Sequence, residues 1–268
     1  MTEPDQVFLG REVGGTAFGT DALGYHQARL PYPDALYDEL FARIPASPSV
    51  LEIGAGSGLV TEALLARNPD RLVAVEPDAA LVEFTGSRLA DPRLNMVASS
   101  FEKAPISGPF DLIACAAAFH WMEPKSALSR IKSLLQPRGL WAMWWHSYRN
   151  PGRGDALADQ ITPLLRDIPL PPSDTLLRHY SLNEEFHREV LAEAGFQSIE
   201  YRLYTQEREL TTKEVIALFD SYSYVRVLPR ERRTRLLEAI AEIVERNFGG
   251  KAPNLVLTPF YFATSGNL

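Results

Sequence analysis

The sequence has very little cysteine, no long apolar run and no clustered metal ligands. Its one cysteine, Cys115, excludes a disulfide within the chain and argues against a cysteine-based zinc site. The five histidines lack the short spacings that hold a metal ion, so we expect no metal. The first residues are neither basic nor apolar, and no stretch is long enough to cross a bilayer. These absences favour a cytoplasmic protein without a membrane partner.

An excess of basic charge is also lacking. The formal net charge is −7 and the pI is about 5.4, which argues against a nucleic-acid partner. The arginine-rich run at 226–235 also contains Glu231, so it is more typical of the solvated start of a helix. With 46% hydrophobic residues in 268 positions, the chain can bury a full core. The oligomeric state is not encoded in any pattern that we recognise.

A glycine-rich stretch organises the N-terminal half. The apolar run 50–53, which includes Glu52, is followed by Gly54, Gly56 and Gly58 and then by a helical pattern of apolar residues. This order predicts a buried strand, a tight loop and a helix. The glycines let the backbone turn sharply and approach a ligand, and the helix start adds free N–H groups. Open α/β sheets build nucleotide sites in this way.

Two residues near this loop narrow the ligand class. A dinucleotide fingerprint would place its last glycine at position 59, where Leu59 stands, and this disfavours a nicotinamide oxidoreductase. Glu76 ends the next predicted strand, at about the spacing from which a carboxylate reaches a ribose; the alternative is an ordinary surface acid. An unpaired Glu52 inside an apolar strand would be costly, so we expect a partner, for which a positive ligand group is one candidate.

Strands and helices alternate along the rest of the chain, which predicts a parallel sheet. The first 24 residues are glycine-rich and are expected to form an irregular arm. Residues 147–183 look like an insertion with one or two helices that Pro163 kinks or splits. Further strands are expected at 72–75, 94–98, 110–115, 140–145, 198–207 and 255–264, and helices at 34–44, 59–67, 77–89, 127–135, 184–194, 230–248 and from 211 onward.

In this order, the glycine motif, Glu76, Ser100-Phe101 and the later strands resemble the class I S-adenosylmethionine-dependent methyltransferases. The segments 25–33 and 118–121 resemble a small-molecule group within that class, of type 11 or trans-aconitate methyltransferase-like. The resemblance implies an α/β fold: a Rossmann-like, seven-stranded, mostly parallel sheet whose last strand is antiparallel, with helices on both faces and a helical lid. It also implies an arm and cofactor-binding core at 1–146, a lid insertion at 147–183, and the remaining core at 184–268 with a helical insertion at 208–250.

The resemblance further implies how S-adenosyl-L-methionine is bound. Glu52 and the loop would hold the methionine end, Glu76 would accept both ribose hydroxyls, and Arg29 would pair with the cofactor carboxylate. For Arg29 the alternative is a solvated charge beside a helix. The full set of implied cofactor-binding residues is Arg29, Glu52, Gly54, Ala55, Gly56, Gly58, Glu76, Pro77, Ser100 and Phe101, of which the last two would line the adenine.

His120 lies in the loop after the fourth strand, where the methyl donor should point. It is either a general base or a hydrogen-bonded wall residue. Core packing is the alternative for Trp145, and helix capping for Tyr222. The residues expected around the acceptor are Tyr25, Trp121, Trp145, His146 and Tyr222. We therefore expect methyl transfer to a small molecule, at a carboxylate or at a phenolic or other heteroatom group. The alternative is a non-catalytic S-adenosylmethionine-binding regulator or partner protein.

Overall fold

The computed structural model describes residues 10, 21–172, 175 and 178–266. The chain divides into two compact units. Unit 1 comprises the chain up to Leu30, His146–Leu182 and Thr205–Thr258, and unit 2 comprises Pro31–Trp145, Asn183–Tyr204 and the chain from Pro259 onward. Most of the expected irregular arm lies outside the described residues. Where its end is described, Ala22–Ala28 forms helix α2, because Asp21 caps the helix by accepting the N–H of Gly24 at 2.9 Å.

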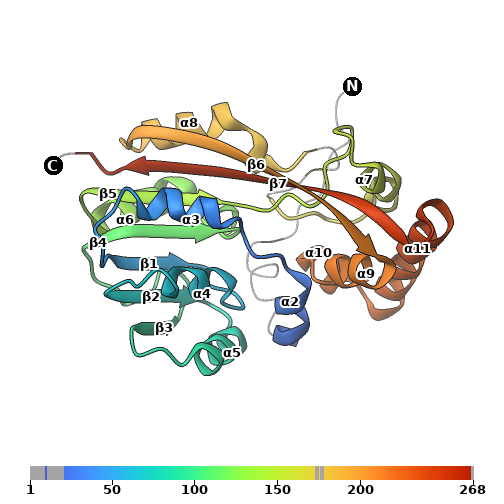
Figure 1. The fold of residues 1–268 in the computed structure, drawn as a ribbon, viewed down its shortest axis with the longest axis horizontal. Coiled ribbons are helices and arrows are strands. Elements are labelled where there is room, and N and C mark those ends of the chain that lie inside the picture. The colour runs from blue at the N-terminus through green and yellow to red at the C-terminus, as the bar shows by residue number, and fades with distance from the viewer. Residues whose placement is uncertain (1–9, 11–20, 173–174, 176–177, 267–268) are drawn as a thin grey trace. The chain divides into compact units, whose positions relative to one another are not determined.

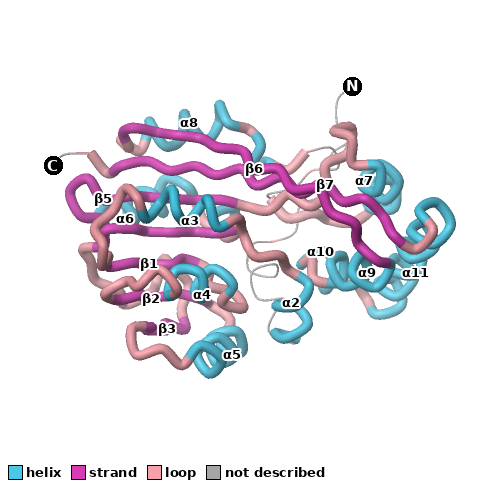
Figure 2. Tube along the Cα trace, viewed as in Figure 1, coloured by secondary structure: helices cyan, strands magenta, loops and turns pink. Residues whose placement is uncertain are grey.

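Seven strands form a sheet in the order β3-β2-β1-β4-β5-β7-β6, as Figures 1 and 2 show. Each pair of neighbours from β3 to β5 is parallel, whereas β7 runs antiparallel to β5. This confirms the predicted Rossmann-like sheet with an antiparallel last strand. The strands are β1 Ser49–Ile53, β2 Arg71–Glu76, β3 Leu94–Ala98, β4 Phe110–Ala116, β5 Leu135–Trp144, β6 Gln197–Thr211 and β7 Lys251–Thr264.

In unit 2, α3 (Asp34–Phe41) and α4 (Leu59–Leu65) pack on one face of the sheet. Alternate residues of the strands, such as Val50, Leu112 and Trp144, share their buried cluster. Helix α8 (Glu184–Glu193) packs on the opposite face, where its His187 contacts the rings of Trp145 and Tyr261. Helix α6 (Pro124–Leu134) packs against β5 and α8, and α5 (Ala79–Leu89) packs against β2 and β3.

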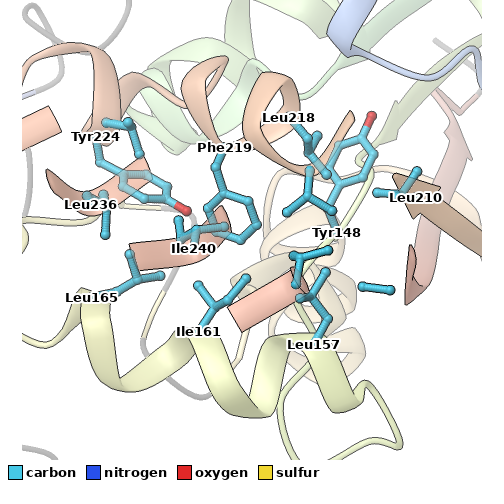
Figure 3. Close-up of a cluster of buried hydrophobic side chains, with 14 of the residues drawn as sticks. Tyr148, Leu157, Ile161, Leu165, Leu210, Leu218, Phe219, Tyr224, Leu236 and Ile240 are labelled. Atoms are coloured by element: carbon cyan, nitrogen blue, oxygen red, sulfur yellow. The ribbon is translucent and has the colours of Figure 1, made fainter. Parts of the chain in front are cut away.

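Unit 1 has its own hydrophobic cluster, shown in Figure 3. Phe219, Tyr224 and Ile240 meet there, together with Ile161 and Leu165. The cluster is therefore a second core, separate from the one between sheet and helices in unit 2. Besides α2, the described part of unit 1 contains the helices α7 Ala156–Ile161, α9 Thr212–Asp220, α10 Ser223–Arg226 and α11 Arg230–Phe248, and the 3-10 turns η3 at Thr162–Leu165 and η4 at Tyr180–Leu182.

Several local predictions are confirmed and several boundaries are wrong. Helix α11 has the predicted bounds, and the α-helix before Pro163 ends at Ile161, where the chain continues as a 3-10 turn. Strand β5 begins at Leu135 rather than 140, and α3 ends three residues before Ile44. Strand β6 extends to Thr211 because its pairing with β7 continues although most of its side chains are exposed, so no burial period marks it. Among the described residues, no helix could span a membrane.

Candidate active site

The parallel strands of unit 2 end along one edge of the sheet, the position at which α/β folds bind ligands. The glycine loop follows β1, Glu76 ends β2, and the turn η2 (Phe119–Trp121) comes soon after β4. Trp145 follows β5 directly. In the described part of the chain, no three His, Cys, Asp or Glu side chains are grouped so that they could hold a metal ion.

The glycine loop is tightly turned and lies against the segment after β4. Gly54, Gly56 and Gly58 have φ angles of 75°, 55° and 83°, values that residues with a side chain rarely adopt. A Cβ atom on Gly54 would lie only 2.4 Å from the Cβ of Ala118. Glycine at position 54 therefore serves two purposes: it permits the turn, and it lets the loop that leads to His120 approach the backbone. The sequence predicted the turn but not this approach.

Glu76 fixes the same loop from the side of β2. Its Oε2 accepts the N–H of Gly56 at 2.9 Å, and its Oε1 accepts the N–H of Asp78 at 3.0 Å. The side chain is 5% exposed, and burial raises its pKa to about 7, although the two backbone hydrogen bonds act in the opposite direction. Because each carboxylate oxygen can accept more than one hydrogen bond, Glu76 retains capacity for two ligand hydroxyls.

Glu52 is a buried carboxyl group at the end of β1. It is 1% exposed, and its Oε2 atom has no hydrogen-bond partner in the described part of the chain. Burial raises its pKa to about 8; the nearby Thr61 hydroxyl lowers it and the charge of Glu76 raises it further. A buried acceptor without a donor is costly unless a ligand supplies one. The site therefore fits a ligand that brings an ammonium or N–H group to Glu52.

The end of β3 lies beside Glu76, since the N–H of Ser99 donates to the Glu76 carbonyl at 3.1 Å. The backbone carbonyl of Ser100 accepts the N–H of Ala104 at 2.9 Å, which shapes the turn that follows. The Phe101 ring is buried under the guanidinium of Arg130, 5.2 Å from the ring centroid. The Phe101 ring therefore contributes to packing. The predicted contact with the adenine would use the backbone of Phe101. Pro77 is exposed.

His120 and two of the residues predicted around the acceptor, Trp121 and Trp145, come together after β4 and β5. The indole Nε1–H of Trp145 donates to Nδ1 of His120 at 3.2 Å, and the Trp121 ring lies 4.6 Å from the imidazole. Trp145 is 1% exposed and packs against His187 at 5.6 Å, so it is both a core residue and a hydrogen-bond donor. The sequence analysis did not predict that His187 contacts this group. His187 lies on the buried side of α8, as a core residue does.

The predicted residues of unit 1 form an arrangement of their own. The Arg29 guanidinium lies over the rings of Tyr25, Tyr148 and Tyr222, with centroid distances of 5.3, 5.5 and 4.9 Å. Its Nη2 donates to the Ser221 carbonyl at 3.0 Å. Three aromatic faces around one cation stabilise its position. Tyr148 was not predicted, because a single tyrosine after a strand carries no signal of its own.

His146 is also part of unit 1, where it is 8% exposed. Its Nδ1 is hydrogen-bonded to the Thr258 hydroxyl at 2.8 Å, and its ring lies 5.2 Å from that of Tyr148. These contacts account for the burial of His146 within unit 1. The assigned roles of Tyr25, Arg29, His146 and Tyr222 therefore stay predictions.

Known proteins share both the sequence pattern and the fold. A family model described as a methyltransferase domain matches residues 50–139, from β1 into β5. An uncharacterized methyltransferase of Schizosaccharomyces pombe is 25% identical over 234 residues, which cover 86% of this chain and 88% of the relative. A structure described as a type II methyltransferase from Anaeromyxobacter dehalogenans has a TM-score of 0.64 at 22% identity, covering 89% of this chain and 97% of the other.

A second solved structure is a Haemonchus contortus phosphoethanolamine N-methyltransferase in complex with phosphomonomethylethanolamine and S-adenosylhomocysteine. Its TM-score is 0.55 at 13% identity, with 93% of this chain and 58% of the other covered. The trans-aconitate-like subgroup stays a prediction, because these similarities extend across the wider class. The strand order, the glycine loop and the methyltransferase domain matched at residues 50–139 together support a class I S-adenosylmethionine-dependent methyltransferase, whose cofactor is S-adenosyl-L-methionine.

Proposed function

We propose that this enzyme transfers a methyl group from S-adenosylmethionine to a small-molecule acceptor at the edge where β1, β2, β4 and β5 end. The proposal depends mainly on Glu52, which lies just before the glycine loop. Its buried Oε2 atom has no hydrogen-bond partner among the described residues. A ligand with an amino group and a ribose suits Glu52 and Glu76 together. No other buried carboxylate in the described ranges combines this position with an unsatisfied oxygen.

The donor-binding roles follow from the positions of the groups. Glu52 would accept a hydrogen bond from the amino group, while Gly54, Gly56 and Gly58 let the ligand approach the backbone of the loop, including that of Ala55. Glu76 would accept the ribose hydroxyls with the lone pairs that Gly56 and Asp78 leave unused. Ser100 and Phe101 would contact the adenine from the end of β3, and Pro77, which directly follows Glu76, would contact the cofactor from the end of β2. Arg29 would pair with the carboxylate of the cofactor.

The acceptor side is assigned to His120, Trp121 and Trp145. When bound, the sulfonium of the cofactor supplies an electrophilic methyl group. The work of the chain is then to align the acceptor atom with that methyl, and such positioning can contribute about 7–11 kcal/mol. His120 lies two residues after Ala118, which closely approaches Gly54, so the imidazole is carried by a segment that contacts the donor-binding loop. A carboxylate acceptor needs no base, whereas a phenol must lose its proton.

Other predictions await a test of their own. The segments 147–183 and 208–250 belong largely to unit 1, and their role as a lid, with Tyr25, His146 and Tyr222 contributing to the acceptor pocket, stays a proposal. The cytoplasmic location and the absence of nucleic-acid partners also stay predictions from charge and composition.

Two measurements test the proposed function. Calorimetric titration with S-adenosylmethionine should show one site per chain, and no binding at millimolar cofactor would contradict the proposal. An assay for S-adenosylhomocysteine should then be run on a library of small carboxylic acids and phenols. Release above the acceptor-free background identifies the acceptor class. Cofactor binding without release for either class would direct the search to nitrogen and carbon acceptors.

A further inference from the structure

The hydrogen bond between Trp145 and His120 has a fixed direction. An indole nitrogen carries a hydrogen and no available lone pair, so Trp145 can only donate. At 3.2 Å, its partner atom, Nδ1 of His120, must therefore be the unprotonated nitrogen of the ring. In a neutral imidazole one nitrogen donates and the other accepts. The proton of neutral His120 is then on Nε2.

We propose that Trp145 is a positioning residue that fixes the tautomer of His120, so that His120 acts at the active site as a hydrogen-bond donor through Nε2–H and not as a general base. The inference rests on the proposed function for the location of the active site. It goes beyond that function because it decides between the two roles that the sequence leaves open for His120, and it assigns a task to a residue that lies behind the imidazole.

The surroundings of Trp145 make the arrangement rigid. The side chain is 1% exposed, and its backbone N–H donates to the Pro259 carbonyl of β7 at 3.3 Å. The indole ring packs against His187, which is fully buried and lies 4.8 Å from the ring of Tyr261. Because the indole cannot rotate without disturbing this packing, its N–H stays directed at Nδ1. The other tautomer would bring two N–H groups together without an acceptor between them.

This tautomer limits what His120 can do. A general base needs a lone pair toward the proton that it removes, and here the lone pair of the neutral ring is directed at the indole. An Nε2–H group can instead hold and orient an atom of the acceptor molecule that already has a lone pair. The reaction would then proceed without proton removal by His120, and substitution of His120 by another neutral donor should be tolerated better than substitution by alanine.

The neighbouring tryptophan provides a matched control. Trp144 is as deeply buried as Trp145 and precedes it directly, but it points to the opposite face, where it meets the rings of Tyr32, Tyr37 and Phe260. Its indole Nε1 has no hydrogen-bond partner in the described part of the structure. Trp144→Phe and Trp145→Phe thus remove the same group from adjacent core positions, and only the second removes the bond to His120.

The test is a long-range ¹H–¹⁵N spectrum of protein labelled with ¹⁵N-histidine, recorded without substrate at about pH 8, above the ordinary histidine pKa of roughly 6.5. His120→Gln identifies the His120 signals among the five histidines. We expect one protonated and one unprotonated ring nitrogen, with Nε2 protonated. In Trp145→Phe, the two ¹⁵N shifts should move toward each other as the tautomers interconvert, whereas Trp144→Phe should keep the wild-type pattern.

Two outcomes would overturn the proposal: a protonated Nδ1 in the wild-type protein, or a Trp145→Phe spectrum that keeps the wild-type pattern at His120. The first is decided without any variant at position 145, so a failure of Trp145→Phe to fold does not prevent the test. Cofactor titration of the same samples reports on the proposed function separately. A protein that binds no S-adenosylmethionine but shows the predicted tautomer would contradict only the function.

Discussion

The backbone N–H of Gly56 donates to Oε2 of Glu76 at 2.9 Å, so the predicted ribose-binding residue also holds the glycine loop in place. Loop shape and ligand recognition thus depend on one carboxylate. Because Oε1 of Glu76 accepts the Asp78 N–H as well, both oxygens contact the backbone. Substitution of Glu76 should therefore affect the cofactor in two ways, by removing its contact and by loosening the loop.

Glu76→Gln is expected to weaken S-adenosylhomocysteine binding about 10- to 100-fold, equivalent to roughly 1.4–2.7 kcal/mol. The amide can present only one oxygen to the two backbone N–H groups and the ligand, and its NH₂ group would face an N–H donor. Calorimetric titration measures the change. The control is Glu83→Gln, at an exposed position on α5, which should bind like wild type. Equal affinities for the two variants would refute the role assigned to Glu76.

Gly54→Ala is expected to lower the free energy of unfolding and to abolish detectable cofactor binding. The new Cβ would lie 2.4 Å from the Cβ of Ala118, in addition to the strain of a φ angle of +75°. Gly152→Ala is a matched control, because Gly152 has a φ of +71° with no atom within 4 Å of an added Cβ. In urea denaturation we expect Gly54→Ala to cost about 1–3 kcal/mol more than Gly152→Ala. Similar losses would mean that the contact with Ala118 is easily relieved.

The ligand-free protein should lose stability as the pH rises from about 5 to 8. The pKa values of Glu52 and Glu76 are raised by burial to about 8 and about 7, above those of an unfolded chain, so the folded state binds more protons over this range. Each such group lowers the free energy of unfolding by up to about 1.4 kcal/mol per pH unit within its window. Urea denaturation at several pH values measures the slope.

Glu52→Gln isolates the contribution of Glu52 to the pH dependence of the free energy of unfolding. The glutamine variant cannot ionise at this position, so its stability should decline less steeply between pH 6 and pH 8 than that of wild type. A slope equal to that of wild type would show that Glu52 ionises at its ordinary pKa in the folded protein. The comparison requires no ligand and is therefore independent of the proposed function.

Arg29→Met separates two roles of one side chain. Loss of the contacts with three tyrosine rings and the Ser221 carbonyl should lower the free energy of unfolding by about 1–2 kcal/mol. If Arg29 also binds the cofactor carboxylate, affinity for S-adenosylhomocysteine should fall at least tenfold while affinity for methylthioadenosine, which lacks that carboxylate, is unchanged. Equal changes for the two ligands would leave Arg29 with a structural role only.

The fold could be predicted largely because its signals are local. The apolar run before Gly54, the stripe of α11 and the capping box of Thr211 with Glu214 are each contained in a few residues. Two predictions failed for different reasons. The Asp21 cap of α2 is a local signal that the neighbouring glycines obscured, whereas pairing with β7, which is not local, extends β6 through mostly exposed residues.

The sequence by itself determined the order of the strands along the chain, the glycine loop, the class of cofactor and the candidate residues around the methyl donor. Only the tertiary structure decided how these residues act on one another. The sheet places the ends of β1, β4 and β5 side by side, so Gly54 approaches Ala118. In the same way Trp145 contacts His120, which is 25 positions earlier in the chain. Such contacts depend on strand neighbours rather than on sequence neighbours, and a linear pattern carries no record of which side chains a sheet brings together.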